Sequence, residues 1–396
     1  MPSDKSLRTR WKFATRGIAT GLRDRFAFES NGGKLDIPSV DEVIDRVEAA
    51  AGKAAHEAGR ERKDVDRALD KLRSQLGSAI KALRKDENAE LTPSQELALE
   101  TVVKVDGTRP STLLRDGALP DDDPRLGEWR QELAGFKPAI KQFADATGRI
   151  EPNDGSASNF FGTGFLVGAN GTVLTNWHVL DAMLRRSSTL AEEIDGTFRI
   201  YDGVRIDFGG ETQSLARKRF KVVSATPSGI DGNSFARLDI AVLRIEALPE
   251  SPALPTPVPL LADLNAAQGA TAPVCVIGFP GRPEQISGTS DGIDWTWVTN
   301  QLIVGGYGLK RFAPGEIEPI VGSIAGDTHS WVMGHDATTL GGSSGSPILL
   351  LHQPGHAFGI HFAGSSGTAQ RLNYAHALTP DARDRLKAMQ VAVMDP

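Results

Sequence analysis

The sequence predicts two regions of different fold class, an α-helical region up to about residue 150 and an all-β region of the barrel or sandwich type after it. In the first region, apolar residues recur at helical spacing. After residue 158, about ten short β-like runs alternate with loops rich in Gly and Pro. A polar, turn-rich stretch at 148–158 separates them, so we place the domain boundary between residues 150 and 151, giving domains 1–150 and 151–396.

The composition limits the class of protein. The chain has 396 residues, of which 40% are hydrophobic and 24% charged, as in soluble globular proteins. Its net charge of −6 gives no support to nucleic-acid binding, which favours a basic stripe. Cys275 is the one cysteine, so no intrachain disulfide can form. Because the N-terminus also lacks the apolar centre of a signal peptide, we expect a cytoplasmic protein.

The first 26 residues are basic, with seven Lys or Arg against two Asp. Apolar residues at helical spacing would give a basic amphipathic helix, which can contact a membrane surface or an acidic partner. Gly17 and Gly21 weaken that helix. We therefore favour a frayed tail, or a helix packed on its own protein.

Residues 38–85 predict a helical hairpin. Its first helix starts at the capping box Ser39 to Glu42 and ends at Gly59. Its second helix carries an apolar seam with the spacing of a short heptad repeat. The favoured role is packing within the hairpin, and binding of a partner protein is the alternative. The seam consists of Val65, Leu69, Leu72, Leu76, Ala79 and Leu83.

Two further helices are expected at about 93–104 and 126–146. The first opens with a capping box from Thr92 to Gln95, with Pro93 at the first helical position. The second carries large apolar residues at helical spacing and is interrupted by Pro138. Its apolar residues are Leu126, Trp129, Leu133, Phe136, Ile140 and Phe143.

The all-β region opens with a predicted hairpin, in which strands at 161–167 and 172–175 are joined by an Asn170-Gly171 turn. A last helix is expected from Thr379 to Val391, with Thr379 as its cap. The other predicted strands lie at 198–201, 221–224, 238–245, 274–278, 295–304, 330–333, 348–351, 358–362 and 374–377.

A loop crowded with Gly and Ser at 341–346 runs into an apolar strand. A serine hydroxyl is a poor nucleophile until a base removes its proton, and the oxyanion then formed needs backbone N–H donors. Glycines let two amides converge on one point. The loop therefore suits a reactive serine, although an ordinary turn explains the loop alone equally well.

Two upstream motifs favour the catalytic interpretation. His178 follows the predicted strand 172–175, where an imidazole can face a cleft. Asp239 stands at the start of an apolar strand, where a buried carboxylate is costly unless something binds it. Singly, these residues fit a surface histidine and a strand-start aspartate. Together with the serine loop, they indicate nucleophilic catalysis.

The order of His, Asp and Ser and all three local motifs resemble the chymotrypsin-fold, trypsin-like serine peptidases. The resemblance is closest to the bacterial branch of glutamyl endopeptidases and HtrA-like enzymes. It covers about residues 159–390 and includes the stretch 275–281, Cys-Val-Ile-Gly-Phe-Pro-Gly. It implies an all-β double six-stranded barrel, chymotrypsin-like, with a cleft between the barrels, and a serine endopeptidase that works through an acyl-enzyme.

The resemblance also implies roles for single residues. Ser344 would attack the acyl carbon, His178 would take and return its proton, and Asp239 would hold the imidazole tautomer. The amides of Gly342 and Ser344 would form the oxyanion hole. In trypsin, an aspartate before the nucleophile pairs with a newly cut N-terminus. Here that residue is Ser343, so another cause must order the catalytic loop.

By the same resemblance, the specificity pocket lies between the segment before the nucleophile and the strand 359–364. Its base offers no carboxylate to attract Lys or Arg. His361 and Thr339 match the positions with which glutamyl endopeptidases hold an acidic side chain, charge-assisted if His361 is protonated. A His361 packed under Phe362 without such a role is the alternative. The predicted pocket residues are Thr338, Thr339, His361, Phe362 and Gly364.

No metal or cofactor is expected, because the other histidines lack metal-ligand spacing and no phosphate loop or dinucleotide fingerprint occurs. The predicted partners are a protein or peptide substrate and a protein recruited or restrained by the N-terminal helices. Two other functions remain open. One is an inactive peptidase fold used as a binding scaffold, and the other is an esterase or acyltransferase with the same triad.

Overall fold

The computed structural model describes residues 62–85, 109–120, 129–154, 159–186, 188–211, 217–228, 235–263, 271–281, 307–324, 326–364 and 373–394, with a few single positions between them. The predicted helix at 38–59, the basic segment 1–26 and the predicted strand 295–304 lie outside the described residues.

The first barrel is an antiparallel sheet of eight strands in the order β5-β6-β8-β7-β2-β3-β4-β9. Because β8 also pairs with β9, six of these strands close on themselves, and the hairpin β5–β6 extends outward from β8. The strands are β2 (Thr147–Pro152), β3 (Gly162–Gly168), β4 (Thr172–Thr175), β5 (Leu190–Ile194), β6 (Thr197–Asp202), β7 (Val204–Asp207), β8 (Arg219–Pro227) and β9 (Ala241–Ala247).

The second barrel has seven strands in the order β1-β11-β10-β13-β14-β15-β12. A bridge between Ile317, just past β11, and His335 of β12 closes six of them, and β1 adds to the outside of β11. The strands are β1 (Thr112–Leu113), β10 (Pro273–Gly278), β11 (Arg311–Glu316), β12 (Val332–His335), β13 (Pro347–Leu350), β14 (Ala357–Gly364) and β15 (Asn373–Ala377).

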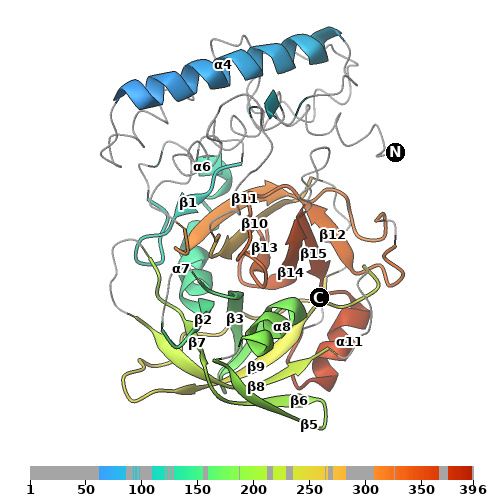
Figure 1. Cartoon of the computed structure of the whole chain (residues 1–396). Helices are drawn as coiled ribbons and strands as arrows, with labels where there is room; N and C mark the ends of the chain where they lie inside the picture. Colours follow the sequence, from blue (N-terminus) through green and yellow to red (C-terminus); the bar gives the residue numbers. More distant parts are fainter. Residues whose placement is uncertain are drawn as a thin grey trace.

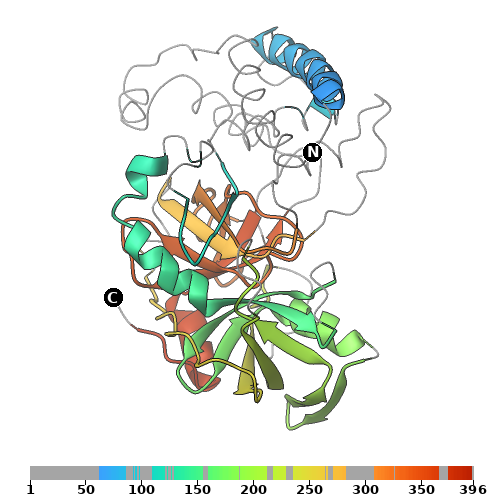
Figure 2. The same ribbon diagram turned by 90° about the vertical axis from the view of Figure 1, so that its left-hand side faces the viewer.

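The predicted double six-stranded barrel is thus confirmed, with the hairpin β5–β6 and the strand β1 as additions. Both views show the two barrels stacked on each other, with the helix α8 beside the first (Figures 1 and 2). The predicted domain boundary between residues 150 and 151 falls inside β2, a fully buried strand that pairs with β3 and β7.

Five helices accompany the barrels in the described part of the chain. They are α4 (Arg62–Lys85), α6 (Trp129–Glu132), α7 (Lys137–Ala146), α8 (Trp177–Arg185) and α11 (Pro380–Ala388). None of the helices that the structure describes is long and apolar enough to span a bilayer. In both views α4 is drawn apart from the barrels (Figures 1 and 2).

Local sequence signals explain the ends of several helices. Thr379 caps α11, with its hydroxyl oxygen accepting from the Ala382 N–H at 3.4 Å. Thr92 and Gln95 form the predicted capping box, with side chain bound to backbone in both directions. The prediction of a single helix at 126–146 is wrong in one respect, because the structure has two helices there, α6 and α7. Pro138 lies in the first turn of α7, where its missing N–H costs nothing.

The apolar core reaches beyond the barrels into the chain ahead of them. Trp129 of α6 and Phe143 of α7 belong to one buried cluster with Phe165 of β3, and Leu114, still earlier, joins it. A second cluster fills the other barrel. Truncating a fully buried aromatic residue such as Phe143 to alanine costs about 3–5 kcal/mol. The chain from residue 114 onward is therefore part of the folded unit.

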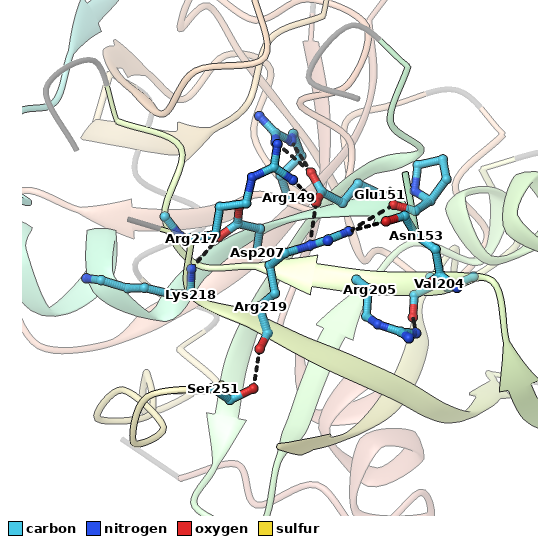
Figure 3. Close-up of polar contacts among 12 residues, drawn as sticks. Arg149, Glu151, Asn153, Val204, Arg205, Asp207, Arg217, Lys218, Arg219 and Ser251 are labelled. Carbon is cyan, nitrogen blue, oxygen red and sulfur yellow. Dashed lines mark hydrogen bonds and ion pairs between the residues drawn. The ribbon is translucent and has the colours of Figure 1, made fainter. Parts of the chain in front are cut away.

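A buried ionic cluster holds the middle of the first barrel. Glu151 of β2 is completely buried, and Arg149, on the same strand, places Nε and Nη2 at 2.9 and 2.5 Å from its Oε2. Arg219 of β8 brings Nε to 3.0 Å from Oε1, and Arg217 approaches to 3.7 Å (Figure 3). Arg149 also donates to the carbonyl of Gly308, so the cluster connects the two barrels.

Candidate active site

Asp239 holds His178 by both its ring and its backbone. His178 is the second residue of α8, and Asn176 precedes the helix as its N-cap. The Oδ2 of Asp239 lies 2.6 Å from the His178 Nδ1, and its Oδ1 accepts from the His178 backbone N–H at 3.0 Å. Asn176 donates its side-chain amide to the carbonyl of Asp239 at 2.8 Å. The predicted His–Asp pair is therefore assembled in this structure.

This arrangement determines which ring nitrogen can act as a base. Burial alone would raise the pKa of Asp239, but the hydrogen bond from the His178 ring and the His178 charge outweigh it, and the pKa lies below its usual value. An ionised carboxylate can only accept, so the Nδ1 of His178 carries a proton, and in the neutral ring Nε2 is the nitrogen with the lone pair. The ring is 43% exposed and can reach a substrate.

The loop around Ser344 owes its shape to glycine. Gly342 and Gly345 have φ of +90° and +89°, in the left-handed region that favours glycine. A Cβ on Gly342 would stand 2.7 Å from the ring of Phe160, and one on Gly345 would collide with Thr163 of β3. Thr163 also binds the loop, because its N–H donates to the Ser344 carbonyl and its hydroxyl donates to the Gly342 carbonyl, both at 2.8 Å.

The backbone amides of this loop fall into two groups. The N–H groups of Ser343, Gly345 and Ser346 donate to the carbonyls of Leu340, His361 and Ser343. Within the described residues, the N–H groups of Gly342 and Ser344 donate to no protein acceptor. The two amides predicted for the oxyanion hole are thus the ones left available for a ligand.

Ser344 and His178 come to one place from different barrels. Gly162, at the start of β3, lies close to the residue after His178 and to Ser344, since a Cβ there would lie 2.7 Å from the side chain of Val179 and 3.1 Å from the Ser344 carbonyl. His178 and Asp239 belong to the first barrel, and Ser344 enters the second through β13. The three predicted residues therefore gather where the barrels meet.

The predicted pocket histidine is buried against a second histidine. His361 is buried, and its Nδ1 lies 3.1 Å from the Nε2 of His335. Burial, together with the charges of His335 and His178, lowers the pKa of His361 well below its usual value, and a hydrogen bond to the Tyr374 backbone only partly opposes this. His361 is therefore neutral near pH 7.

The other predicted pocket residues have mixed surroundings. The hydroxyl of Thr338 donates to the backbone carbonyl of Arg109 at 2.7 Å. Phe362 stacks on His376, with ring centres 4.2 Å apart, while the ring of His361 packs against His335. Gly364 pairs with Asn373 at the end of β14, and Thr339 is partly exposed.

His376 is a site residue that the sequence analysis missed. Its Nε2 accepts the backbone N–H of Asp239 at 2.9 Å, so the second barrel also holds the aspartate. The ring is fully buried, which lowers its pKa to about 4 and keeps it neutral. No spacing in the sequence connects His376 with Asp239, because they lie 137 residues apart. Among the described residues, no group of three or more His, Cys, Asp or Glu is arranged to hold a metal.

Comparisons with known proteins agree with this geometry. Residues 162–360 match the family description "Trypsin-like peptidase domain". A probable serine protease of Lysobacter enzymogenes is 40% identical over 306 residues, which is 76% of this chain and 77% of that protein. The chain therefore belongs to the trypsin-like peptidase family, a family of serine endopeptidases.

Among solved structures, two inactive forms of the Rv3671c protease are similar at greater distance. The first, a mutant from M. tuberculosis H37Rv, has 19% sequence identity and a TM-score of 0.38, covering 65% of this chain and 93% of the other. The second has 19% identity and a TM-score of 0.35, covering 63% and 92%.

Proposed function

We propose that the protein is a serine endopeptidase in which Ser344, His178 and Asp239 form the catalytic triad and the amides of Gly342 and Ser344 form the oxyanion hole. The observation that carries this proposal is that Asp239 binds both the ring and the backbone of His178, together with a serine loop whose Gly342 and Ser344 amides donate to no acceptor among the described residues. The family membership supports the same class of reaction.

The reaction follows from these positions. The Nε2 of His178 takes the proton of the Ser344 hydroxyl while the Oγ attacks the carbonyl carbon of the peptide. The negative oxygen accepts from the two amides, each worth about 10²–10³ in kcat in a comparable site. His178 then gives its proton to the departing amine, which leaves an acyl-enzyme ester on Ser344. Water attacks the ester by the same route and restores the hydroxyl.

Preference for a substrate residue is a separate proposal. A charge-assisted hold on an acidic side chain needs a protonated His361, and the buried, neutral ring does not favour one. An uncharged side chain before the scissile bond therefore suits the pocket better than Glu or Asp. Cleavage of a peptide library separates the two, since strong selection for Glu at neutral pH would restore the acidic preference.

We further propose that the enzyme acts in the cytoplasm on selected proteins, with the N-terminal helices as a recruiting or regulatory module. The support is the single, buried Cys275 and the presence of a long helix, α4, ahead of the two barrels. Cell fractionation tests the location. Deletion of residues 1–90 tests the module, which is rejected if neither activity nor any interaction changes.

The experiment for the catalytic proposal is labelling with a fluorophosphonate probe together with peptide cleavage, for wild type and Ser344→Ala. The account expects both signals in the wild type and neither in the variant. Labelling without peptide cleavage, with hydrolysis of simple esters, would favour the esterase. A folded wild type that shows no signal at all would favour the binding scaffold.

A further inference from the structure

We propose that Arg109 is a positioning residue for catalysis, whose guanidinium holds the chain that leads into the Ser344 loop. The proposal rests on the proposed protease function, because the loop it orders is the one that carries the nucleophile. It also supplies what the sequence leaves open, namely what orders this loop when Ser343 replaces the aspartate of trypsin.

Arg109 is buried between two carboxylates of the second barrel. Its side chain is only 2% exposed, and its Nη2 lies 2.5 Å from the Oδ2 of Asp336 and 3.4 Å from the Oε2 of Glu316. The guanidinium also lies over the ring of Trp129, 5.5 Å from its centre. Without this cation, Asp336 and the buried Glu316 would lose the positive charge that lies against both carboxylates, which is costly in a site largely shielded from water.

The two carboxylates connect Arg109 with the backbone of the catalytic loop. The Oδ1 of Asp336 accepts the Glu316 N–H at 2.8 Å, and the Asp336 N–H donates to the Glu316 carbonyl at 3.2 Å. Thr338 then donates its hydroxyl to the Arg109 carbonyl. Asp336 precedes Ser344 by eight residues (344 − 336 = 8) and Thr338 by six (344 − 338 = 6). The segment between the Arg109 contacts and the nucleophile is therefore short.

That short segment is stiffened by its own hydrogen bonds. The Ser343 N–H donates to the Leu340 carbonyl at 3.0 Å, and the Leu340 N–H reaches the Ser343 hydroxyl at 3.4 Å. The Ser343 carbonyl in turn accepts from the hydroxyl and the N–H of Ser346, at 2.6 and 3.0 Å. A shift at Asp336 or Thr338 is therefore transmitted to the amides of Gly342 and Ser344.

Arg109 belongs to a segment that is fixed to the second barrel and, further along, to the first. The strand β1 pairs with β11, beside which it is drawn in Figure 1. Arg311 donates to the Ser111 carbonyl at 2.9 Å, and the Leu114 N–H donates to the Lys310 carbonyl at 3.2 Å. The Gly117 N–H donates to Glu211 at 2.8 Å. The region ahead of the barrels thus has a direct physical connection to the catalytic loop.

The test uses the full chain with Arg109→Ala and two controls. Arg115→Ala removes an exposed arginine from the same segment, and Leu386→Ala weakens the core at α11, far along the chain from the loop. Hydrogen exchange of the peptide that covers residues 335–346 is the first readout, because it needs no activity. We expect exchange in this peptide to quicken at least tenfold in Arg109→Ala alone.

The second readout is the rate of fluorophosphonate labelling together with kcat for a peptide. We expect Arg109→Ala to lose at least tenfold in both, and added guanidinium at low millimolar concentration to restore part of the loss. Arg109→Lys keeps the charge and should fall between wild type and Arg109→Ala, and it replaces Arg109→Ala in both readouts if the alanine variant does not fold.

Each outcome decides the proposal. Unchanged exchange at 335–346 overturns it, as does equal loss in Leu386→Ala, which would mean that Arg109 acts only through overall stability. A wild type without activity would count against the proposed protease function, while the exchange result would still decide whether Arg109 orders the loop.

Discussion

Each barrel contains an ion-paired cluster of arginine and carboxylate side chains. The two clusters differ in how far apart in the sequence their bonded residues lie. In the first barrel, Arg149 binds Glu151 two residues away on the same strand. In the second, Arg109 binds Asp336 across 227 residues. The ion pairs of the first cluster lie within one barrel and can form once β2, β7 and β8 are paired, and Arg149 then also donates to Gly308 of the second barrel. The long-range cluster makes the catalytic loop depend on a segment from the other end of the folded unit.

The residues of the proposed triad also differ in which parts of the chain hold them in place. His178 and Asp239 are fixed mainly by bonds between themselves and their close neighbours. The loop of Ser344 is fixed by contacts with β3, β14 and, through Asp336 and Thr338, Arg109. The base is thus held mainly from within its own barrel, with one contact from His376 of the second barrel to the Asp239 backbone. The nucleophile loop has contacts from the other barrel and from the segment around Arg109.

The largest expected effect comes from removing the nucleophile. Ser344→Ala should lower kcat by about 10⁴–10⁶ and leave the melting temperature almost unchanged, because a small side chain is lost from a partly exposed loop. Adding Asp239→Asn should lower kcat no further, since residues of the two barrels act as one unit. If the double variant instead lost the product of the two single losses in kcat, Ser344 and Asp239 would be acting separately.

Asp239→Asn alone should lower kcat by about 10⁴. The amide that replaces the carboxylate can donate to Nδ1, which favours the tautomer with the proton on Nε2 and so removes the base. Steady-state kinetics at pH 7 measures the loss, and circular dichroism should show an unchanged fold. Full activity in this variant would remove Asp239 from the triad.

Glu151→Ala separates stability from positioning. It leaves the buried Arg149 and the partly buried Arg219 without their carboxylate, which should lower the free energy of unfolding by about 3–5 kcal/mol. Urea denaturation measures this effect. Activity per folded molecule should stay within about twofold of wild type, in contrast to Arg109→Ala. If Glu151→Ala and Arg109→Ala lost kcat equally, the two clusters would not differ in their effect on catalysis, which would contradict the account.

A smaller effect should follow acidification. Burial lowers the pKa of both His335 and His376 to about 4, from 6.5 for an exposed histidine. The unfolded chain therefore binds more protons between these values, and the free energy of unfolding should fall as pH drops from about 6.5 to 4, by about 3 kcal/mol for each ring. Urea denaturation at pH 7, 5.5 and 4.5 tests this, with the exposed His352→Gln as control. A flat profile would contradict the neutral, buried rings.

The sequence predicted the elements that local patterns can specify. The hairpin β3–β4 was predicted from alternation and an Asn-Gly turn, and the structure has Gly171 at φ +80° in that turn. The strands β8, β9, β10, β13, β14 and β15 lie within a few residues of their predicted positions. The same local motifs nominated His178, Asp239 and Ser344, although their roles remain predictions.

Elements that depend on distant partners were missed for a physical reason. The strand β2 reads as a polar turn because it contains Arg149 and Glu151, whose burial is compensated by their own ion pair and by Arg219 of β8. The strand β11 contains Pro314 and Gly315, which disfavour a strand in isolation. His376 and Arg109 carry no local signal, because their importance exists only after both barrels have folded.

The most direct test of the central claim is to map the site of fluorophosphonate labelling by mass spectrometry of proteolytic peptides. The account predicts one phosphonyl group, attached to Ser344, and its disappearance in both Ser344→Ala and His178→Ala. Attachment to a different residue, or undiminished labelling after either substitution, would contradict the proposed triad.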